Sequence, residues 1–288
     1  MPDDSFVEEL LSQIVQRLQT VAGIEAVVLG GSRALGSHTS TSDVDLGLYY
    51  RPDAPPDLDA LRRVAAEIDD EHRSDIITPL HEWGPWINGG GWLKVRGLAV
   101  DFLYRDLAQV EQVIDDCRAG EVQIFYQAGH PHGFVTSIYM GEVAVCRPLW
   151  DPHGTLQMLK ALTDPYPPAL QRAVMDKFTW EARFSLDTAR KSAARGDAEY
   201  VAGCCFRSAA CLMQTLFALN RRYLLNEKGV VTRAAALPLC PPALEERVQG
   251  AFGQLNGEAQ GLSTALDELE SVVREVEELV AGVRATIA

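Results

Sequence analysis

The spacing of hydrophobic positions changes character near residue 150 of the chain. Before this point, short β-branched or alternating runs, which are typical of strands, are interleaved with segments of helical spacing. The strand-like runs are residues 24–29, 44–50, 75–78, 92–95 and 98–104. The helical segments are residues 6–22, 33–37, 57–72 and 106–118. This interleaving predicts a mixed β-sheet flanked by helices.

After residue 150 the hydrophobic spacing is helical. The helical segments there are residues 169–195, 198–225, 242–253 and 258–286. Gly196 and Asp197 supply a helix stop and then an N-cap between the first two segments. The sequence therefore predicts an α+β fold, with a mixed-sheet domain over residues 1–150 and an all-α helical domain over residues 151–288.

Local residues predict where several of these elements begin and turn. Ser32, Asp57 and Asp106 each stand at the start of an expected helix, where their side chains are favoured as N-caps. Arg96 and Gly97 separate two strand-like runs, so they predict the turn of a β-hairpin.

Two carboxylates stand at alternate positions where the strand over residues 44–50 begins. Side chains at positions i and i+2 of a strand point to one face, so those of Asp43 and Asp45 converge. Neighbouring carboxylates repel each other, and a fold tolerates them when a divalent cation lies between them. Hard oxygen ligands suit Mg²⁺, which also brings substrate phosphates. The pattern therefore predicts a magnesium site.

A glycine-rich turn precedes these carboxylates. Gly30 and Gly31 allow close approach to the backbone, and the expected helix after them would point N–H groups and its positive end outward. Ser32 and Arg33 would add a hydroxyl donor and a positive charge. We expect this segment to bind phosphate. The alternative, a glycine-rich turn beside an acidic strand end, leaves the flanking apolar strands unexplained.

The string Gly-Gly-Ser-Arg-Ala-Leu-Gly-Ser at residues 30–37 is followed by Ser-Asp-Val-Asp-Leu-Gly-Leu at residues 42–48. Together they resemble the signature of the DNA polymerase beta nucleotidyltransferase superfamily. Within it they are similar to the small-molecule branch, which includes aminoglycoside, lincosamide and minimal nucleotidyltransferases. The specific resemblance is confined to this segment. The N-terminal half is compatible with it, and a helical C-terminal domain is common in the branch.

The resemblance implies a third carboxylate from a neighbouring strand, and Asp101 is the candidate. An acid within the apolar run over residues 98–104 is costly unless it is paired or bound to a metal. Asp101 could instead face water at a strand edge. Asp75 and Asp106 are weaker rivals, because both stand at ends of elements, where Asp caps or turns.

The resemblance also implies a reaction, the transfer of a nucleoside monophosphate from a nucleoside triphosphate to an acceptor hydroxyl. We expect ATP as the nucleotide and a small hydroxylated molecule as the acceptor, for example an aminoglycoside-like antibiotic. Asp43, Asp45 and Asp101 would hold two Mg²⁺ ions, and Asp101 could accept the acceptor's proton. The residues expected to bind the nucleotide are Gly30, Gly31, Ser32, Arg33 and Lys228.

Several other residues allow both a functional and a structural interpretation. Lys228 could reach the triphosphate from the second domain, or it could be a solvated residue at a helix end. Glu181 and Glu199 could line an acceptor pocket, or they could be surface or paired carboxylates. His130 and His132 lack a third metal ligand nearby, which favours loop residues. The tryptophans that could stack on a ring or pack under a loop are Trp83, Trp86 and Trp92.

Charge narrows the choice of acceptor. Asp and Glu number 40 against 26 Lys and Arg, which gives a formal net charge of −14. This field disfavours a nucleic-acid partner and attracts a cationic small molecule, although it could serve solubility alone. No apolar run reaches the roughly 18 residues of a membrane span, and no basic export signal precedes the first helix. We expect a cytoplasmic enzyme with six reduced cysteines, and a homodimer is compatible with the sequence.

Two alternatives to this enzyme remain. The first is a toxin–antitoxin component whose nucleotidyltransferase domain modifies or binds a partner protein, although the minimal members of that class are usually much shorter. The second is a binding module without activity, which would be expected to lack a motif carboxylate, whereas Asp43 and Asp45 are both present. Transfer of a nucleoside monophosphate to a small molecule would favour the enzyme, and transfer to a partner protein would favour the toxin–antitoxin component.

Overall fold

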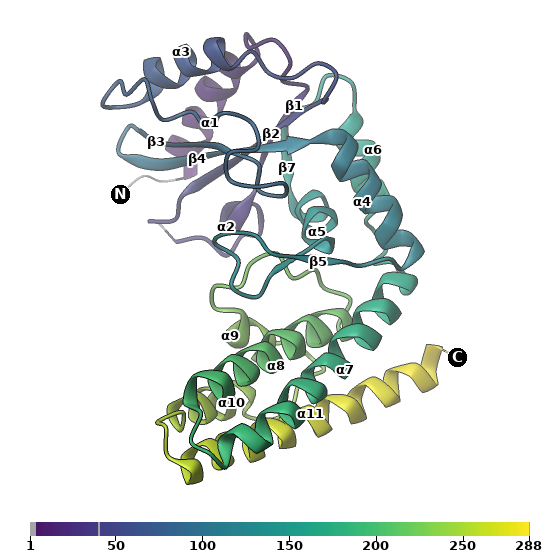
Figure 1. The fold of residues 1–288 in the computed structure, drawn as a ribbon. Coiled ribbons are helices and arrows are strands. Elements are labelled where there is room, and N and C mark those ends of the chain that lie inside the picture. The colour runs from purple at the N-terminus through teal and green to yellow at the C-terminus, as the bar shows by residue number, and fades with distance from the viewer. Residues whose placement is uncertain (1–3, 40, 288) are drawn as a thin grey trace. The chain divides into compact units, whose positions relative to one another are not determined.

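The computed structural model describes residues 4–39 and 41–287 (Figure 1). The chain forms two compact units. The first takes in the chain up to Asp115 together with Ile124–Pro165. The second takes in Asp116–Gln123 and the chain from Tyr166 onward.

A mixed sheet forms the centre of the first unit (Figure 1). Its strands are β1 (Ala26–Leu29), β2 (Val44–Tyr50), β3 (Gly90–Val95), β4 (Leu98–Asp106) and β7 (Arg147–Trp150). They lie in the order β3-β4-β2-β1-β7. The β2–β4 pair is parallel, and the other neighbouring pairs are antiparallel. The predicted mixed sheet in an α+β fold is therefore confirmed.

One face of this sheet is buried under α1 (Asp4–Leu18) and α3 (Leu58–Ile68). Alternate residues of the central strands, such as Leu46 and Phe102, are fully buried there with Ile14 of α1 and Leu61 of α3. Because side chains alternate along a strand, the residues between them point to the opposite face. Asp45 and Asp101 lie on that opposite face.

The opposite face is covered at one end by α5 (Ser137–Val145). Arg105 of β4 is 3% exposed and donates from Nε and Nη2 to the two carboxylate oxygens of Glu142 on α5, both at 2.7 Å. This bidentate ion pair fixes α5 near the end of β4. Asp45 and Asp101 lie nearer the beginning of their strands.

The first unit also contains several short elements. They are α2 (Gly31–Ala34), α6 (Thr155–Ala161) and the two-stranded pair β5 (Ile124–Phe125) and β6 (Phe134–Val135). The longer α4 (Leu107–Ala119) follows β4 directly and continues into the second unit. The sequence patterns do not predict α5, α6 or β7.

Most of the expected caps and turns are confirmed. Asp57 accepts hydrogen bonds from the amides of Asp59 and Ala60 at 3.0 Å, and so caps α3. Asp106 caps α4 through the amides of Ala108 and Gln109. Arg96 and Gly97 have φ values of 51° and 84°, as the tight turn of a right-twisted hairpin requires.

Two local predictions are wrong. Residues 75–78 form no strand, because only an isolated bridge joins Ile77 to Gly91. Ser32 is not the N-cap of the short helix, which begins at Gly31, two residues before the expected start at residue 33, with Gly30 as its cap. Gly31 adopts a φ of 58°, one of the unusual backbone conformations that glycine allows.

Helices make up the second unit, as predicted. They are α7 (Pro168–Ala193), α8 (Ala198–Leu219), α9 (Val230–Ala235), α10 (Leu244–Gly253) and α11 (Ala259–Ile287). Gly196 has a φ of 72° after α7, and Asp197 caps α8 through the amide of Tyr200. In the described part of the chain α8 is the one helix long and apolar enough to cross a membrane, yet 72% of its apolar window is buried, as in a core helix.

All six cysteines are free. Cys117, Cys146, Cys205 and Cys211 are buried, and burial raises the pKa of each of these thiols. A raised pKa keeps the thiol protonated near neutral pH, so these cysteines behave as small hydrophobic residues of the core.

Candidate active site

Asp45 and Asp101 are directly opposed on the two parallel strands of the sheet. The register pairs Asp45 of β2 with Asp101 of β4, so their side chains share one face of the sheet. Both residues are half-buried. Adjacent strands lie about 4.8 Å apart. Two carboxylates that are distant in sequence thus meet on the face opposite the hydrophobic core.

Asp43 stands one residue before β2, is exposed, and precedes Asp45 by two positions. Within residues 4–39 and 41–287, no group of three or more His, Cys, Asp or Glu side chains is placed to hold a metal ion by itself. Mg²⁺ is usually bound by one or two carboxylates together with waters and substrate phosphates. The oxygen donors of Asp45 and Asp101 suit such an open site better than a closed protein cage.

Gly31 lies directly against the Asp45 carboxylate. A Cβ built at Gly31 would lie 1.7 Å from Oδ2 of Asp45, well inside van der Waals contact. The Gly30 amide donates to the Asp45 carbonyl oxygen at 2.8 Å, which holds the turn against β2. The glycines therefore bring the phosphate-binding candidate segment and the carboxylate together, and a side chain at position 31 would have to displace the Asp45 carboxylate.

The same hydrogen bond limits what the turn can offer to a phosphate. The Gly30 amide is committed to Asp45, whereas the amides of Gly31, Ser32 and Arg33 begin α2 and have no partner within the helix. The remaining candidate donors of this segment are therefore the backbone of α2 and the Ser32 hydroxyl.

Arg33 bonds to the loop before β2, and its predicted contact with phosphate stays a prediction. Its Nη2 donates to the Ser42 carbonyl oxygen at 2.8 Å, and its Nε donates to the Asp43 carbonyl oxygen at 3.1 Å. The guanidinium therefore fixes the loop that delivers Asp43 to the start of β2. This contact positions a carboxylate and does not by itself place the charge on a phosphate.

The rival acids do not join this arrangement. Asp106 is occupied as the N-cap of α4 and pairs in register with Tyr50, far along β2 from Asp45. Asp75 is exposed and lies outside the strands. Asp101 is therefore the acid that the sheet brings beside Asp45.

The three loop tryptophans divide into two groups. Trp86 packs with Phe125, Phe134 and Tyr139, with ring centroids 4.9 to 5.7 Å apart, and so lies under the loop. Trp83 and Trp92 instead stack on each other, with centroids 4.4 Å apart and planes inclined by 19°. Trp92 is 59% exposed. Trp86 therefore packs under the loop, whereas a functional role for Trp83 and Trp92 stays a prediction.

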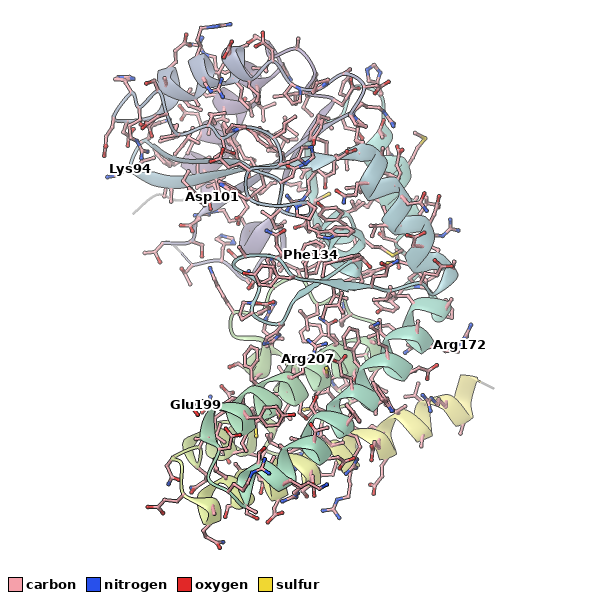
Figure 2. All side chains as sticks on the ribbon, viewed as in Figure 1. Lys94, Asp101, Phe134, Arg172, Glu199 and Arg207 are labelled. Carbon is pink, nitrogen blue, oxygen red and sulfur yellow. The ribbon has the colours of Figure 1, made fainter. Side chains whose placement is uncertain are left out.

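The remaining candidates belong to other elements of the chain, and several of them have structural partners. Glu181 accepts from Nε of Arg207 at 2.6 Å, and this bond holds its pKa below the ordinary value. Glu199 lies exposed in the first turn of α8 (Figure 2). His130 packs edge-on against Phe134, and burial lowers its pKa, as expected for a neutral loop residue.

Lys228 is exposed in a loop of the second unit. The Asn226 side chain accepts from the Lys228 amide at 2.8 Å, and Arg233 donates to the carbonyl oxygens of Asn226 and Lys228. The loop backbone is therefore held in a defined turn. Its predicted contact with the triphosphate stays a prediction.

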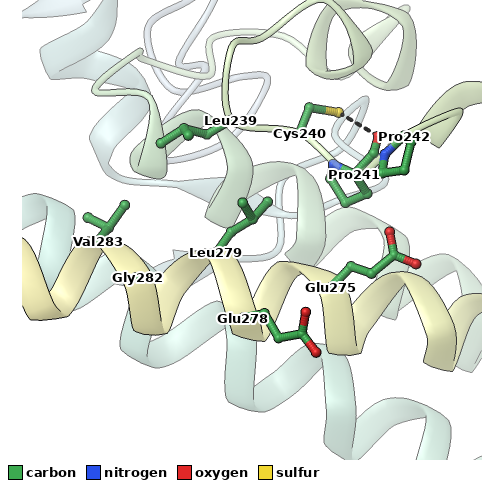
Figure 3. A pocket seen from close by; sticks show the side chains of 9 residues that line it. All are labelled: Leu239, Cys240, Pro241, Pro242, Glu275, Glu278, Leu279, Gly282 and Val283. Atoms are coloured by element: carbon green, nitrogen blue, oxygen red, sulfur yellow. Dashed lines mark hydrogen bonds between the residues drawn. The ribbon is translucent and has the colours of Figure 1, made fainter.

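A pocket of about 550 Å³ opens on the second unit (Figure 3). It is lined by α11 and by the segment around Cys240, including Glu275, Glu278 and Leu279. Glu275 is already paired with Arg247, at 2.9 Å. Neither Asp45 and Asp101 nor the glycine turn lines this pocket, so the candidate chemistry belongs to the sheet of the first unit.

Sequence reasoning missed the relation between Trp92 and Asp101. The β3–β4 hairpin pairs them in register, so Trp92 stands beside Asp101 on the same face. Counting outward from the two-residue turn at Arg96 and Gly97 gives this pairing directly. The signal is therefore present in the sequence once the turn has been predicted.

Solved structures similar to this chain include a nucleotidyltransferase-like protein from Exiguobacterium sibiricum 255-15. It is 13% identical and superimposes with a TM-score of 0.41. The match covers 95% of this chain and 76% of that chain. No curated protein matches the sequence. A likeness of this size leaves the activity to be argued from the residues themselves.

A family model gives a more local match. It covers residues 8–87, less than a third of the chain, and includes the glycine turn, Asp43 and Asp45. Asp101 lies outside the matched segment. Residues 8–87 are thus similar to the nucleotidyltransferase domain family, and the carboxylates on β2 belong to that similarity.

Proposed function

We propose that this protein transfers a nucleoside monophosphate from a nucleoside triphosphate, with ATP as the expected donor, to a hydroxyl group of a small molecule. The observation that carries the proposal is the register of Asp45 with Asp101, next to a glycine that touches the Asp45 carboxylate. The match of residues 8–87 to the nucleotidyltransferase domain supports transfer of a nucleoside monophosphate in general.

Asp43, Asp45 and Asp101 would hold Mg²⁺, which when bound would neutralise charge on the triphosphate. In the reaction the acceptor oxygen bonds to the α-phosphorus, and the bond from that phosphorus to the leaving pyrophosphate breaks. Asp101 would take the proton of the acceptor hydroxyl. Ser32 and the α2 amides would orient the outer phosphates, while Arg33 keeps Asp43 in position.

The small-molecule acceptor rests on charge. The formal net charge of −14 opposes a polyphosphate acceptor and favours a cation such as a hydroxylated amine. An aminoglycoside-like antibiotic belongs to this class, and resistance would be the consequence of its modification. Neither the fold nor the family match favours the alternative in which a partner protein is the acceptor. We also expect a cytoplasmic location, and a homodimer is compatible with the sequence.

The test incubates the protein with Mg²⁺, each of the four labelled nucleoside triphosphates and a panel of hydroxylated amines. Mass spectrometry should show a gain of one nucleoside monophosphate on an acceptor. Asp45→Asn and Asp101→Asn should each reduce transfer by roughly 10³-fold or more, because charge stabilisation at the α-phosphate is lost.

Asp53→Asn is the matched control, because Asp53 is exposed in the loop that follows β2. It should leave transfer unchanged. Full turnover by a folded Asp45→Asn protein would refute the assignment. A mass gain on a co-purified protein, with none on any small molecule, would refute the acceptor class.

A further inference from the structure

Four features lie in one row across the exposed face of the sheet. Gly30 follows β1 and bonds to Asp45 of β2, Asp45 is in register with Asp101 of β4, and Asp101 is in register with Trp92 of β3. The strand order β3-β4-β2-β1 fixes this sequence of positions. The glycine turn and Trp92 therefore lie on opposite sides of the carboxylate pair.

This order of positions indicates the side from which the acceptor approaches, and the inference rests on the proposed function. Displacement at phosphorus is in line, so the attacking oxygen enters opposite the leaving pyrophosphate. If the outer phosphates lie toward the turn at Gly31 and Ser32, then the acceptor approaches from the side of Asp101. The next side chain in that direction is Trp92.

Trp92 is built as a platform. Its indole is 59% exposed, and Trp83 stacks on it with ring centroids 4.4 Å apart. A Trp pair of this kind offers a broad flat surface that can stack on the face of a ring and attract a cation. Among the described residues, the strand of Trp92, β3, is an edge strand of the sheet.

The loop that carries Trp83 is held in place by a buried side chain. Gln127 is 3% exposed, and its Nε2 donates to the Trp83 carbonyl oxygen at 2.6 Å while its Oε1 accepts from the Ile87 amide at 3.3 Å. Gly84 lies against the Gln127 amide group, where a Cβ would approach to 2.7 Å. Tyr139 also donates to the Trp86 carbonyl oxygen. The stacked pair is therefore fixed before any ligand arrives.

We propose that the Trp83–Trp92 pair is the acceptor platform of this enzyme, and that it takes a saturated ring bearing hydroxyl and amino groups. The ring would stack on Trp92 through its C–H face, with one hydroxyl directed to Asp101. An ammonium group on the ring would gain from the indole face, for which Trp is the best partner. The platform selects the acceptor from within the first unit.

The test measures binding, so that it does not depend on turnover. Wild-type protein and variants are titrated by calorimetry with 2-deoxystreptamine, a hydroxylated cyclic diamine, in the presence of Mg²⁺ and the non-transferable nucleotide α,β-methylene-ATP. The nucleotide is titrated separately. Trp92→Leu should raise the Kd of 2-deoxystreptamine roughly tenfold, which corresponds to about 1.4 kcal/mol, and should change the nucleotide Kd by less than about twofold.

Trp92→Phe keeps a smaller ring and should give an intermediate loss. Trp180→Leu is the matched control, because Trp180 is 64% exposed and also stacks on an aromatic ring, Phe184, but lies on α7. It should change neither Kd.

Three results would overturn the platform. They are a wild-type protein that binds the nucleotide but not 2-deoxystreptamine, a Trp92→Leu variant that binds both as wild type does, and a Trp92→Leu variant that loses nucleotide affinity instead. The last would assign Trp92 to the nucleobase. A wild-type protein that fails to bind the nucleotide at all would refute the proposed function itself, so the two failures are distinguishable.

Discussion

Replacing Gly31 by alanine should combine the cost of an unusual backbone with the cost of moving a carboxylate. The added Cβ at position 31 would lie 1.7 Å from Oδ2 of Asp45, and ordinary contact begins at 3.4 Å, so the two atoms must separate by about 1.7 Å. Gly31 also has a φ of 58°, which costs a residue with a Cβ about 1 to 2 kcal/mol. Both effects act at one position.

Gly36→Ala isolates the first effect. Gly36 has a φ of 68°, and nothing lies within 4 Å of the position that a Cβ would take there, so alanine carries the backbone cost alone. Urea denaturation should show a loss of about 1 to 2 kcal/mol in the free energy of unfolding for Gly36→Ala, and a larger loss for Gly31→Ala because its Cβ must also displace the Asp45 carboxylate. The stability assay thus establishes that both variants are folded before their activities are compared.

Activity should then differ between the two. Misplacing a reacting group by about 1 Å can cost 10²-fold, so Gly31→Ala should lower kcat/KM for nucleotide transfer by roughly 10²-fold or more. Gly36→Ala should stay within about threefold of wild type, because it leaves Asp45 where it is. Equal activities in two folded variants would refute the inference that contact between Gly31 and Asp45 sets the site geometry.

Three further perturbations follow from contacts in the first unit. Glu142→Gln should lower the free energy of unfolding, measured in urea, by about 3 kcal/mol, because it leaves Arg105 buried without its counter-charge. Glu111→Gln, at the more exposed ion pair with Arg51, should lower it by less than about 1 kcal/mol. Equal losses in the two variants would contradict the role of burial. Asp69→Asn should lower the free energy of unfolding by about 2 kcal/mol at pH 7, because the bond from Arg73 lowers the pKa of the buried Asp69 carboxyl. This stabilisation is present above the unfolded pKa of about 3.9 and is lost as pH falls toward the folded pKa. A stability difference between wild type and variant that persists undiminished at pH 2 would contradict this reasoning. Arg33→Met should raise the Mg²⁺ concentration required for half-maximal transfer roughly fivefold, because two hydrogen bonds to the loop before β2 are lost. An unchanged magnesium titration together with a weaker nucleotide affinity would instead assign Arg33 to the phosphates.

The parts of the fold that the sequence predicts are those with strong local signals. The alternation over residues 44–50 gives β2 with its observed bounds, and the caps at Asp57 and Asp106 are recovered because their carboxylates bond to amides two or three residues away. The hairpin turn at Arg96 and Gly97 is recovered for the same reason. In each case a few neighbouring residues decide the structure.

The parts that the sequence does not predict depend on distant partners. Helix α5 is almost entirely apolar and shows no amphipathic stripe, because it is buried on nearly all sides. Strand β7 contains Pro148 and is recognisable only by its pairing with β1 at the edge of the sheet. The fixed contacts of Gln127 likewise join residues some forty positions apart.

The candidate site divides in the same way. Asp43, Asp45 and the glycines stand close together in sequence, and a motif suffices to find them. Asp101 is predicted from the resemblance and a strand-like run, and the register with Asp45 gives that prediction its geometry. Arg33 shows the limit of a motif, because its neighbours in sequence do not indicate that it bonds to the loop carbonyl oxygens of Ser42 and Asp43.

The parallel pairing of β2 with β4 has a consequence for how the protein folds. Asp45 and Asp101 are more than fifty residues apart, so loop-closure entropy must be overcome before they meet, and the pairing belongs to the slow, non-local steps of folding. A fragment ending at residue 87, where the family match ends, would contain Asp43 and Asp45 but would leave β2 as an edge strand, with the backbone groups that pair with β4 left unpaired. Such a fragment should aggregate rather than act. The smallest part of this chain that can fold around the site must therefore extend at least through β4, which makes the completed carboxylate pair a reporter of native topology.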